Sequence, residues 1–222
     1  MKSAESVDSL KAVLWDMDGT LIDSAAVHFQ AWQEALAVEG YTLTHENFVA
    51  YFGRRNDDII RAYLGAQTSA ETIDRISLDK EERYRAAIRR DGVTLLPGVD
   101  GWLKRLAQDG WKQAIASSAP RLNVEAVLEV TGMTSCFAAI TAAEDVAVSK
   151  PDPAVFLLAA ERLGVPPRRC VVVEDAPAGI EGARRAGMRS VGICGLHDVH
   201  ADLTVRSLEE LPDDAFDRLL AA

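Results

Sequence analysis

Four short apolar runs, each ended abruptly by polar or small residues, constrain the fold of this chain more than any other feature. The first run, at residues 12–15, ends at Asp16. The runs show no alternation of apolar and polar residues, which is typical of strands buried on both faces. The later runs lie at residues 113–116, 170–173 and 190–193. This pattern predicts a parallel sheet covered by helices on both sides.

Helical patterns follow the later part of this series. We expect Asp152 to cap one of these helices, with Pro153 at its first position, and Gly187 to end another. Alternating strands and helices imply right-handed crossovers, so the fold class is α/β with a doubly wound, Rossmann-like core. The helical patterns lie at residues 122–130, 154–163 and 177–186.

The segment 24–91 departs from this alternation because it contains no convincing buried strand. The last of its helical patterns is rich in charge and is typical of a solvated surface helix. We therefore expect a small helical domain at 24–91, inserted after the first strand of a core made of 1–23 and 92–222. Its helical patterns lie at residues 25–39, 46–51, 57–64 and 69–90.

Composition excludes several classes of protein. Lys and Arg number 24 and Asp and Glu number 34, and the resulting charge of −10 argues against a nucleic-acid partner. No apolar run is long enough to span a bilayer, and residues 1–10 lack the apolar stretch of a secretory signal. The three widely spaced cysteines favour reduced, buried thiols in a cytoplasmic protein. Nothing demands more than a monomer, and the oligomeric state stays open.

Polar side chains follow the expected strands at the points where ligands of open parallel sheets bind, beyond the carboxyl ends. A lysine, Lys150, also lies in a loop whose two prolines restrict the backbone. If the topology is right, these groups converge on one crevice. The strand-end groups are Asp16 and Asp18, Ser117 and Ser118, and Glu174 and Asp175.

Carboxylates gathered in one crevice raise one another's pKa values, and a hard divalent cation relieves that conflict. Oxygen-only ligands favour Mg²⁺. An Asp side chain can attack phosphorus, and a second Asp two residues on can protonate the departing alcohol and later deprotonate water. A lysine and a hydroxyl suit the phosphoryl oxygens. These residue types therefore favour phosphoryl transfer, which depends on positioning and charge neutralisation.

In order and placement, the motifs resemble the four-motif signature of the haloacid dehalogenase superfamily of phosphotransferases. The resemblance implies that Asp16 is the nucleophile, that Asp18 is the general acid and base, and that Ser117 and Lys150 bind phosphate. Because dehalogenases generally lack the second Asp, Asp18 argues against dehalogenation. The motifs are D-M-D-G-T from Asp16, then Ser117, Lys150-Pro151 and Glu174-Asp175.

The resemblance also implies a metal site and a cap. It implies Mg²⁺ held by Asp16, Asp175 and the backbone carbonyl of Asp18, with Glu174 helping. The helical insert directly after the first motif resembles the small mobile cap of the family.

A closer resemblance is to the β-phosphoglucomutase-like branch of the superfamily. The sequence H-F-Q-A-W begins at His28, twelve residues after Asp16, where those mutases carry an H-F-x-A-W helix. Lys80, four residues before Tyr84, falls at a cap lysine that in mutases helps to hold the distal phosphate of the sugar.

Several positions depart from the mutase pattern. Asn56 stands where a cap arginine is expected, although Arg54 and Arg55 are near. Thr20 comes directly after Gly19, as in the form of the first motif that is common in phosphatases. Ala119 replaces a serine of the second motif. Taken one by one, the cap arginines and Lys80 also fit a solvated face, whereas as a group they could steer an anionic substrate.

Structural roles remain open for some candidates. Ser117 could cap the following helix as well as bind phosphate, and Ser118 is the competing phosphate ligand. His28 could be a satisfied, half-buried histidine, or it could tune Asp18. We expect the four tryptophans in the core.

The sequence therefore predicts a Mg²⁺-dependent phosphatase that acts on a small phosphorylated metabolite, a sugar phosphate in the first instance, through an aspartyl phosphate. The first alternative is a β-phosphoglucomutase that uses the same nucleophile. The second is a non-catalytic phosphometabolite-binding protein that has kept the fold.

Overall fold

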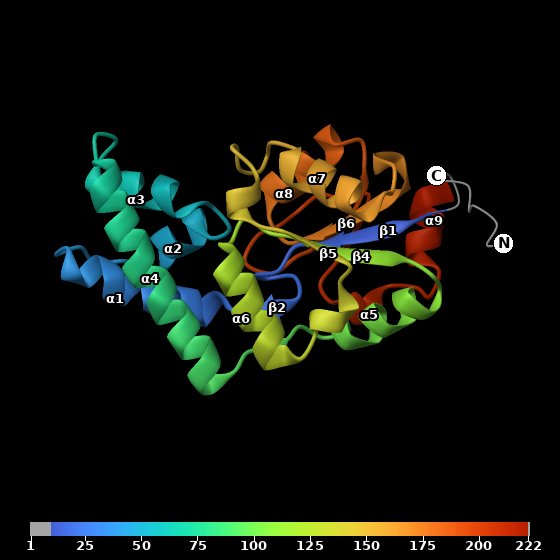
Figure 1. Cartoon of the computed structure of the whole chain (residues 1–222), viewed down its shortest axis with the longest axis horizontal. Coiled ribbons are helices and arrows are strands. Elements are labelled where there is room, and N and C mark those ends of the chain that lie inside the picture. The colour runs from blue at the N-terminus through green and yellow to red at the C-terminus, as the bar shows by residue number, and fades with distance from the viewer. Residues whose placement is uncertain (1–9, 222) are drawn as a thin grey trace.

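The computed structural model describes residues 10–221 and shows a six-stranded parallel sheet between layers of helices (Figure 1). The strand order is β5-β4-β1-β6-β7-β8, which confirms the doubly wound α/β core. The prediction about a secretory signal in residues 1–10 lies almost wholly outside the described residues. The strands are β1 (Ala12–Trp15), β4 (Lys112–Ala116), β5 (Ala139–Thr141), β6 (Cys170–Glu174), β7 (Arg189–Ile193) and β8 (Leu203–Val205).

Two of these strands, β5 and β8, were not predicted. Each has three residues and lies at an edge of the sheet, and each is only partly buried. Edge strands this short do not form the continuous buried run that revealed the central strands.

Alternate residues of β1 point into two separate apolar layers. Val13 and Trp15 pack on one side, and Ala12 and Leu14 pack on the other. This two-sided burial explains why the strand reads as an unbroken apolar run. The first layer is closed by α5 (Val99–Gln108), α6 (Arg121–Thr131) and α9 (Ala215–Ala221), and the second by α7 (Ala154–Leu163) and α8 (Pro177–Arg185).

Four helices follow the first strand and pack around an apolar cluster of their own, beside the sheet (Figure 1). The chain enters and leaves them through an antiparallel pair of two-residue strands, which the sequence did not reveal. The division into two domains stays a prediction. The helices are α1 (Ala25–Val38), α2 (His45–Tyr51), α3 (Asn56–Leu64) and α4 (Ala70–Asp91), and the strands are β2 (Ile22–Asp23) and β3 (Thr94–Leu95).

The prediction of a solvated surface helix is wrong for part of α4. Lys80, Glu81 and Tyr84 are buried, because α4 packs against α1 on one side and α6 on the other. The charges of Lys80 and Glu81 tolerate burial because they pair with each other at 2.8 Å.

Local predictions had mixed outcomes. Gly187 has a φ of +70° just after α8, as expected for a residue that ends a helix. The helix α7 covers the predicted residues 154–163, and the Asp152 carboxylate accepts a hydrogen bond from the Ala154 amide, but Pro153 lies at the flanking position instead of the first helical position.

Burial of the apolar side chains follows the prediction more closely than burial of the thiols. The four tryptophans are buried. The three cysteines are free, but Cys136 and Cys194 are partly exposed. Within residues 10–221, no helix has the length and apolar character that a membrane crossing needs.

Candidate active site

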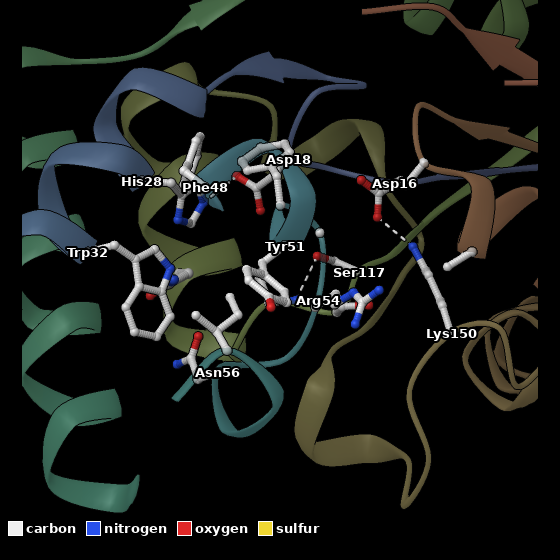
Figure 2. A pocket seen from close by; sticks show the side chains of 18 of the residues that line it. Asp16, Asp18, His28, Trp32, Phe48, Tyr51, Arg54, Asn56, Ser117 and Lys150 are labelled. Atoms are coloured by element: carbon white, nitrogen blue, oxygen red, sulfur yellow. Dashed lines mark hydrogen bonds and ion pairs between the residues drawn. The ribbon is translucent and has the colours of Figure 1, made fainter. Parts of the chain in front are cut away.

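A cavity opens at the carboxyl ends of β1, β4 and β6, between the sheet and helices α1–α4 (Figure 2). Its lining includes every site residue predicted from the sequence except Arg55: Asp16, Asp18, His28, Arg54, Asn56, Lys80, Ser117, Ser118, Lys150, Glu174 and Asp175.

Three buried carboxyl groups and one ammonium group meet at the sheet end of this cavity. Oxygen atoms of Asp16, Glu174 and Asp175 lie within 4.8 Å of one another. The Nζ atom of Lys150 lies 2.5 Å from Asp16 Oδ1 and 2.6 Å from Glu174 Oε1. Residues more than 130 positions apart in the chain are therefore in direct contact, as the parallel topology predicts.

The charge in this cluster is not balanced by its lysine. Burial raises the pKa of Asp16 to about 7, with Lys150 opposing the rise and Glu174 adding to it. Burial and the negative charges of Glu174 and Asp16 raise the pKa of Asp175 well above its ordinary value. Burial alone would lower the pKa of Lys150, but the two carboxylates beside it raise that pKa overall. Buried oxygen donors with excess negative charge fit a hard divalent cation.

Two glycines make room for the carboxylates, and the sequence analysis missed one of them. A Cβ atom at Gly19, whose φ is +82°, would lie 2.1 Å from Asp175 Oδ2. A Cβ atom at Gly179 in α8 would lie 1.8 Å from Glu174 Oε1. Gly19 belongs to a recognisable motif, whereas Gly179 carries no sequence signal beyond being a glycine inside a helix.

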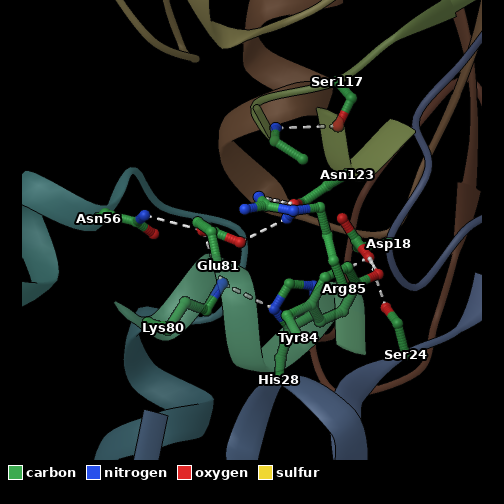
Figure 3. Close-up of polar contacts among 11 residues, drawn as sticks. Asp18, Ser24, His28, Asn56, Lys80, Glu81, Tyr84, Arg85, Ser117 and Asn123 are labelled. Atoms are coloured by element: carbon green, nitrogen blue, oxygen red, sulfur yellow. Dashed lines mark hydrogen bonds and ion pairs between the residues drawn. The ribbon is translucent and has the colours of Figure 1, made fainter. Parts of the chain in front are cut away.

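The side chain of Asp18 makes its polar contacts with residues of the segment that follows β1 (Figure 3). Its Oδ1 atom lies 2.6 Å from Ser24 Oγ, 3.0 Å from His28 Nε2 and 3.2 Å from Tyr84 Oη. Burial raises the pKa of Asp18, but its contacts with His28 and Ser24 and the nearby charge of Lys80 outweigh burial and lower it.

The contact with Lys80 determines which nitrogen of His28 carries the proton. Lys80 Nζ lies 3.0 Å from His28 Nδ1 and 2.8 Å from Glu81 Oε1. An ammonium group only donates hydrogen bonds, so the Nδ1 atom accepts one and carries no hydrogen. The Nε2 atom then holds the hydrogen and donates it to Asp18.

We expect nitrogen NMR to show His28 as this single tautomer near neutral pH, with a protonated Nε2 and an unprotonated Nδ1. The exposed residues His45 and His200 serve as internal controls, since fast exchange should average their two tautomers. Lys80→Met should remove the donor and let the second tautomer of His28 appear. A protonated Nδ1 in the unaltered protein would contradict the assignment.

The two serines after β4 both line the cavity. The Oγ atom of Ser117 accepts a hydrogen bond from the Ala119 amide at 3.0 Å, so its hydroxyl hydrogen can still donate. Ser117 does not cap α6, because that helix begins at Arg121 with Pro120 at its flanking position. That structural alternative was wrong, and the choice between Ser117 and Ser118 as a phosphate ligand stays open.

The remaining candidates from the helical segment have different surroundings. Arg54 is exposed and stacks over the ring of Tyr51, 5.5 Å from its centroid. Arg55 is directed at the carbonyls of Ala143 and Ala147, each at 3.4 Å, and it does not line this cavity. The Nδ2 atom of Asn56 donates to Glu81, as described below.

Sequence reasoning missed four polar residues around this cavity. In the sequence, Tyr84 was used only to locate Lys80, although the two residues are four apart and therefore lie on the same face of a helix. Nothing in the sequence alone links the others to the site, because their partners lie on different elements. The missed residues are Ser24, Glu81, Tyr84 and Asn123.

Comparison with known proteins agrees with this geometry. The model of the haloacid dehalogenase-like hydrolase family matches residues 10–187, which carry all the motifs described above. The chain is a haloacid dehalogenase-like hydrolase. It is therefore an enzyme of the phosphatase and phosphotransferase type, and the alternative of a non-catalytic binding protein is not supported.

Individual relatives within this family cover most of the chain. Protein CbbY of Rhodobacter capsulatus is 36% identical over 191 residues, which are 82% of this chain and 84% of CbbY. The fructose-1-phosphate phosphatase YqaB of Escherichia coli is 34% identical and covers 82% of this chain and 95% of its own length. The crystal structure of a β-phosphoglucomutase from Clostridium difficile superimposes with a TM-score of 0.85 at 27% identity, covering 96% of this chain and 97% of that one.

Proposed function

We propose that this hydrolase is a Mg²⁺-dependent phosphatase of a small phosphorylated metabolite, a sugar phosphate, and that it acts through an aspartyl phosphate. The observation that carries the proposal is the contact between Lys150 and Asp16 inside a buried acidic cluster. Similarity to a fructose-1-phosphate phosphatase supports a sugar phosphate as substrate.

In the first step proposed here, a carboxylate oxygen of Asp16 attacks phosphorus, and the bond from phosphorus to the alcohol oxygen breaks. The electron pair of that bond goes to the alcohol oxygen, which takes a proton from the protonated form of Asp18 and leaves Asp18 as a carboxylate for the next step. In the second step, Asp18 removes a proton from water, which attacks phosphorus and releases phosphate from Asp16. Lys150 and the hydroxyl of Ser117 or Ser118 stabilise the phosphoryl oxygens.

The donors present fit Mg²⁺. We infer that Asp16, Asp175 and the backbone carbonyl of Asp18 hold the ion, with Glu174 helping. When bound, the ion neutralises negative charge on the phosphoryl oxygens and the carboxylates.

The raised pKa of Asp16 gives a pH-dependent test of metal binding. Because that pKa is about 7 in the folded state against an ordinary 3.8, its contribution to stability is fully present below about pH 4 and is lost as the pH rises through 7. Bound Mg²⁺ should restore that contribution to stability at high pH. We therefore expect Mg²⁺ to raise the thermal midpoint, relative to EDTA, by several degrees more at pH 8 than at pH 5. An equal shift at both pH values, or no shift, would count against the site.

The function itself is tested by a panel of phosphorylated sugars, with and without Mg²⁺, in which both free phosphate and isomerised sugar phosphate are measured. The proposal requires stoichiometric phosphate release that depends on Mg²⁺. A panel in which no member releases phosphate would refute it.

A β-phosphoglucomutase is the second candidate, because His28, Trp32 and Lys80 gather beside Asp18 in the cavity and because the chain resembles a mutase in structure. Asn56 and Ala119 weigh against it. The same panel separates the two, since a mutase would convert β-glucose 1-phosphate to glucose 6-phosphate with little free phosphate.

We also propose that residues 24–91 act as a cap that closes over the bound substrate. Contacts of Arg55 with the loop that precedes Lys150 support such closure. Small-angle X-ray scattering should show a smaller radius of gyration with Mg²⁺ and fluoroberyllate than with neither, and an unchanged radius would oppose closure. A cytoplasmic location and a monomeric state stay predictions.

A further inference from the structure

The part of the cavity formed by α3, α4 and α6 holds a buried carboxylate. Glu81 is 5% exposed and lines the cavity together with Asn56 and Asn123. Burial raises the pKa of Glu81, but the charge of Lys80 and the hydrogen bonds from Lys80 and Asn123 lower it overall. This part of the cavity therefore holds a carboxylate group, whose charge is paired with that of Lys80.

The partners of Glu81 leave hydrogen-bonding capacity facing the cavity. Its Oε1 atom accepts from Lys80 and from Asn56 Nδ2, each at 2.8 Å, and its Oε2 atom accepts from Asn123 Nδ2 at 2.5 Å (Figure 3). Among the described residues, Asn56 has no further partner for its Oδ1 atom or its second N–H. The Oε2 atom has a second lone pair. Hydroxyl groups match this set, because each can donate to an oxygen and accept from an N–H.

The neighbouring cations are poorly placed to bind an anion here. Arg85 donates a hydrogen bond to Asn123 Oδ1 at 3.0 Å and does not line the cavity (Figure 3). The ammonium group of Lys80 is committed to His28 and Glu81, and it lies 5.2 Å from the centroid of the Trp32 ring. Lys150 pairs with carboxylates at the other end of the cavity. Of the described lining residues, Arg54 is the remaining lysine or arginine, and it lies exposed on Tyr51.

We propose that Glu81 is a specificity-determining residue, which selects monophosphates whose far end carries uncharged hydroxyl groups and rejects substrates with a second phosphate there. The proposal rests on the proposed function. A second phosphate would lie against a buried carboxylate whose contacting ammonium group, that of Lys80, is already paired, and placing like charges together is costly. A sugar or alditol hydroxyl at the same place gains hydrogen bonds instead.

Two substrate pairs that differ by one phosphate test this inference. They are fructose 1-phosphate with fructose 1,6-bisphosphate, and glucose 6-phosphate with glucose 1,6-bisphosphate. For each pair, kcat and KM for phosphate release are measured with Mg²⁺. We expect kcat/KM of the unaltered enzyme to favour the monophosphate by roughly 10- to 100-fold for at least one pair.

The matched variants are Glu81→Gln and Glu82→Gln, which remove the same charge from a buried and from an exposed position of α4. Glu81→Gln should reduce the preference by at least about tenfold, mainly through a lower KM for the bisphosphate. Glu82→Gln should keep the preference of the unaltered enzyme. A merely structural role of Glu81 would lower the rates with both members of a pair alike and leave their ratio unchanged.

Three results would overturn the inference, and they are separable from failure of the proposed function. The first is an unaltered enzyme that uses the bisphosphates as well as the monophosphates, which needs no variant to detect. The second is an unchanged ratio in Glu81→Gln. The third is hydrolysis of p-nitrophenyl phosphate with neither sugar monophosphate used, which leaves the phosphatase mechanism in place. If no phosphate ester is hydrolysed, the proposed function fails and this inference fails with it.

Discussion

Replacing Asp16 by Asn should lower the rate of phosphate release by at least about 10⁴-fold, with sugar and aryl phosphates alike. An amide oxygen in that place is a poor nucleophile, and the variant also loses the carboxylate of the cluster that pairs with Lys150. Because no alternative nucleophile is proposed, a better leaving group should not rescue the variant. The measurement is kcat with p-nitrophenyl phosphate and with a sugar phosphate, at saturating Mg²⁺.

The same variant should not be destabilised, which separates loss of chemistry from loss of fold. The buried carboxyl of Asp16 has a pKa of about 7, so its ionised form is disfavoured in the metal-free protein. At pH 8 in EDTA, Asp16→Asn should therefore unfold at the same temperature as the unaltered protein or a few degrees higher. Asp23→Asn, at an exposed position in β2, is the matched control and should change neither property. Activity retained by Asp16→Asn would refute the mechanism.

Replacing Asp18 by Asn should slow sugar phosphate hydrolysis by roughly 10²- to 10⁴-fold. Asparagine keeps an oxygen that can accept from Ser24, His28 and Tyr84, so the surrounding network should persist. What it loses is the proton transfer, to the departing alcohol in the first step and from water in the second.

The two halves of the reaction should separate when the leaving group is changed. An aryl phosphate releases a stabilised phenolate that needs no proton, so the first step should remain fast in Asp18→Asn. The second step should stay slow, and a burst of phenolate equal to the enzyme concentration should precede slow turnover. Equal slowing of both steps with the aryl phosphate, and no burst, would contradict a role for Asp18 as the acid.

Burial patterns in the sequence predicted the central sheet well. The runs that became β1, β4, β6 and β7 are buried on both faces, and this is why they show no alternation. Topology then brings Asp16, Lys150 and Asp175 together, although they are far apart in the chain. The order of the motifs could predict this shared site because parallel strands end at the same edge of a sheet.

The cap side of the cavity was less predictable. Its polar contacts join residues from separate elements, such as Glu81 of α4 with Asn123 of α6, and no periodic pattern records such pairs. The charge of α4 suggested exposure, yet Lys80 and Glu81 are buried because they neutralise each other. Sequence patterns report which face of a helix is apolar, but not which charged residues are paired inside the protein.

The central claim is that the Asp16 carboxylate accepts the phosphoryl group, and an acyl phosphate can be trapped chemically. The enzyme would be quenched during turnover of a sugar phosphate with Mg²⁺, treated with borohydride, and analysed by peptide mass spectrometry. Borohydride reduces an aspartyl phosphate to homoserine, whereas it leaves a free carboxylate unchanged. We predict homoserine at position 16, and none there when substrate is omitted. Homoserine at another position, or its absence from position 16 in an enzyme that is turning over, would contradict the account.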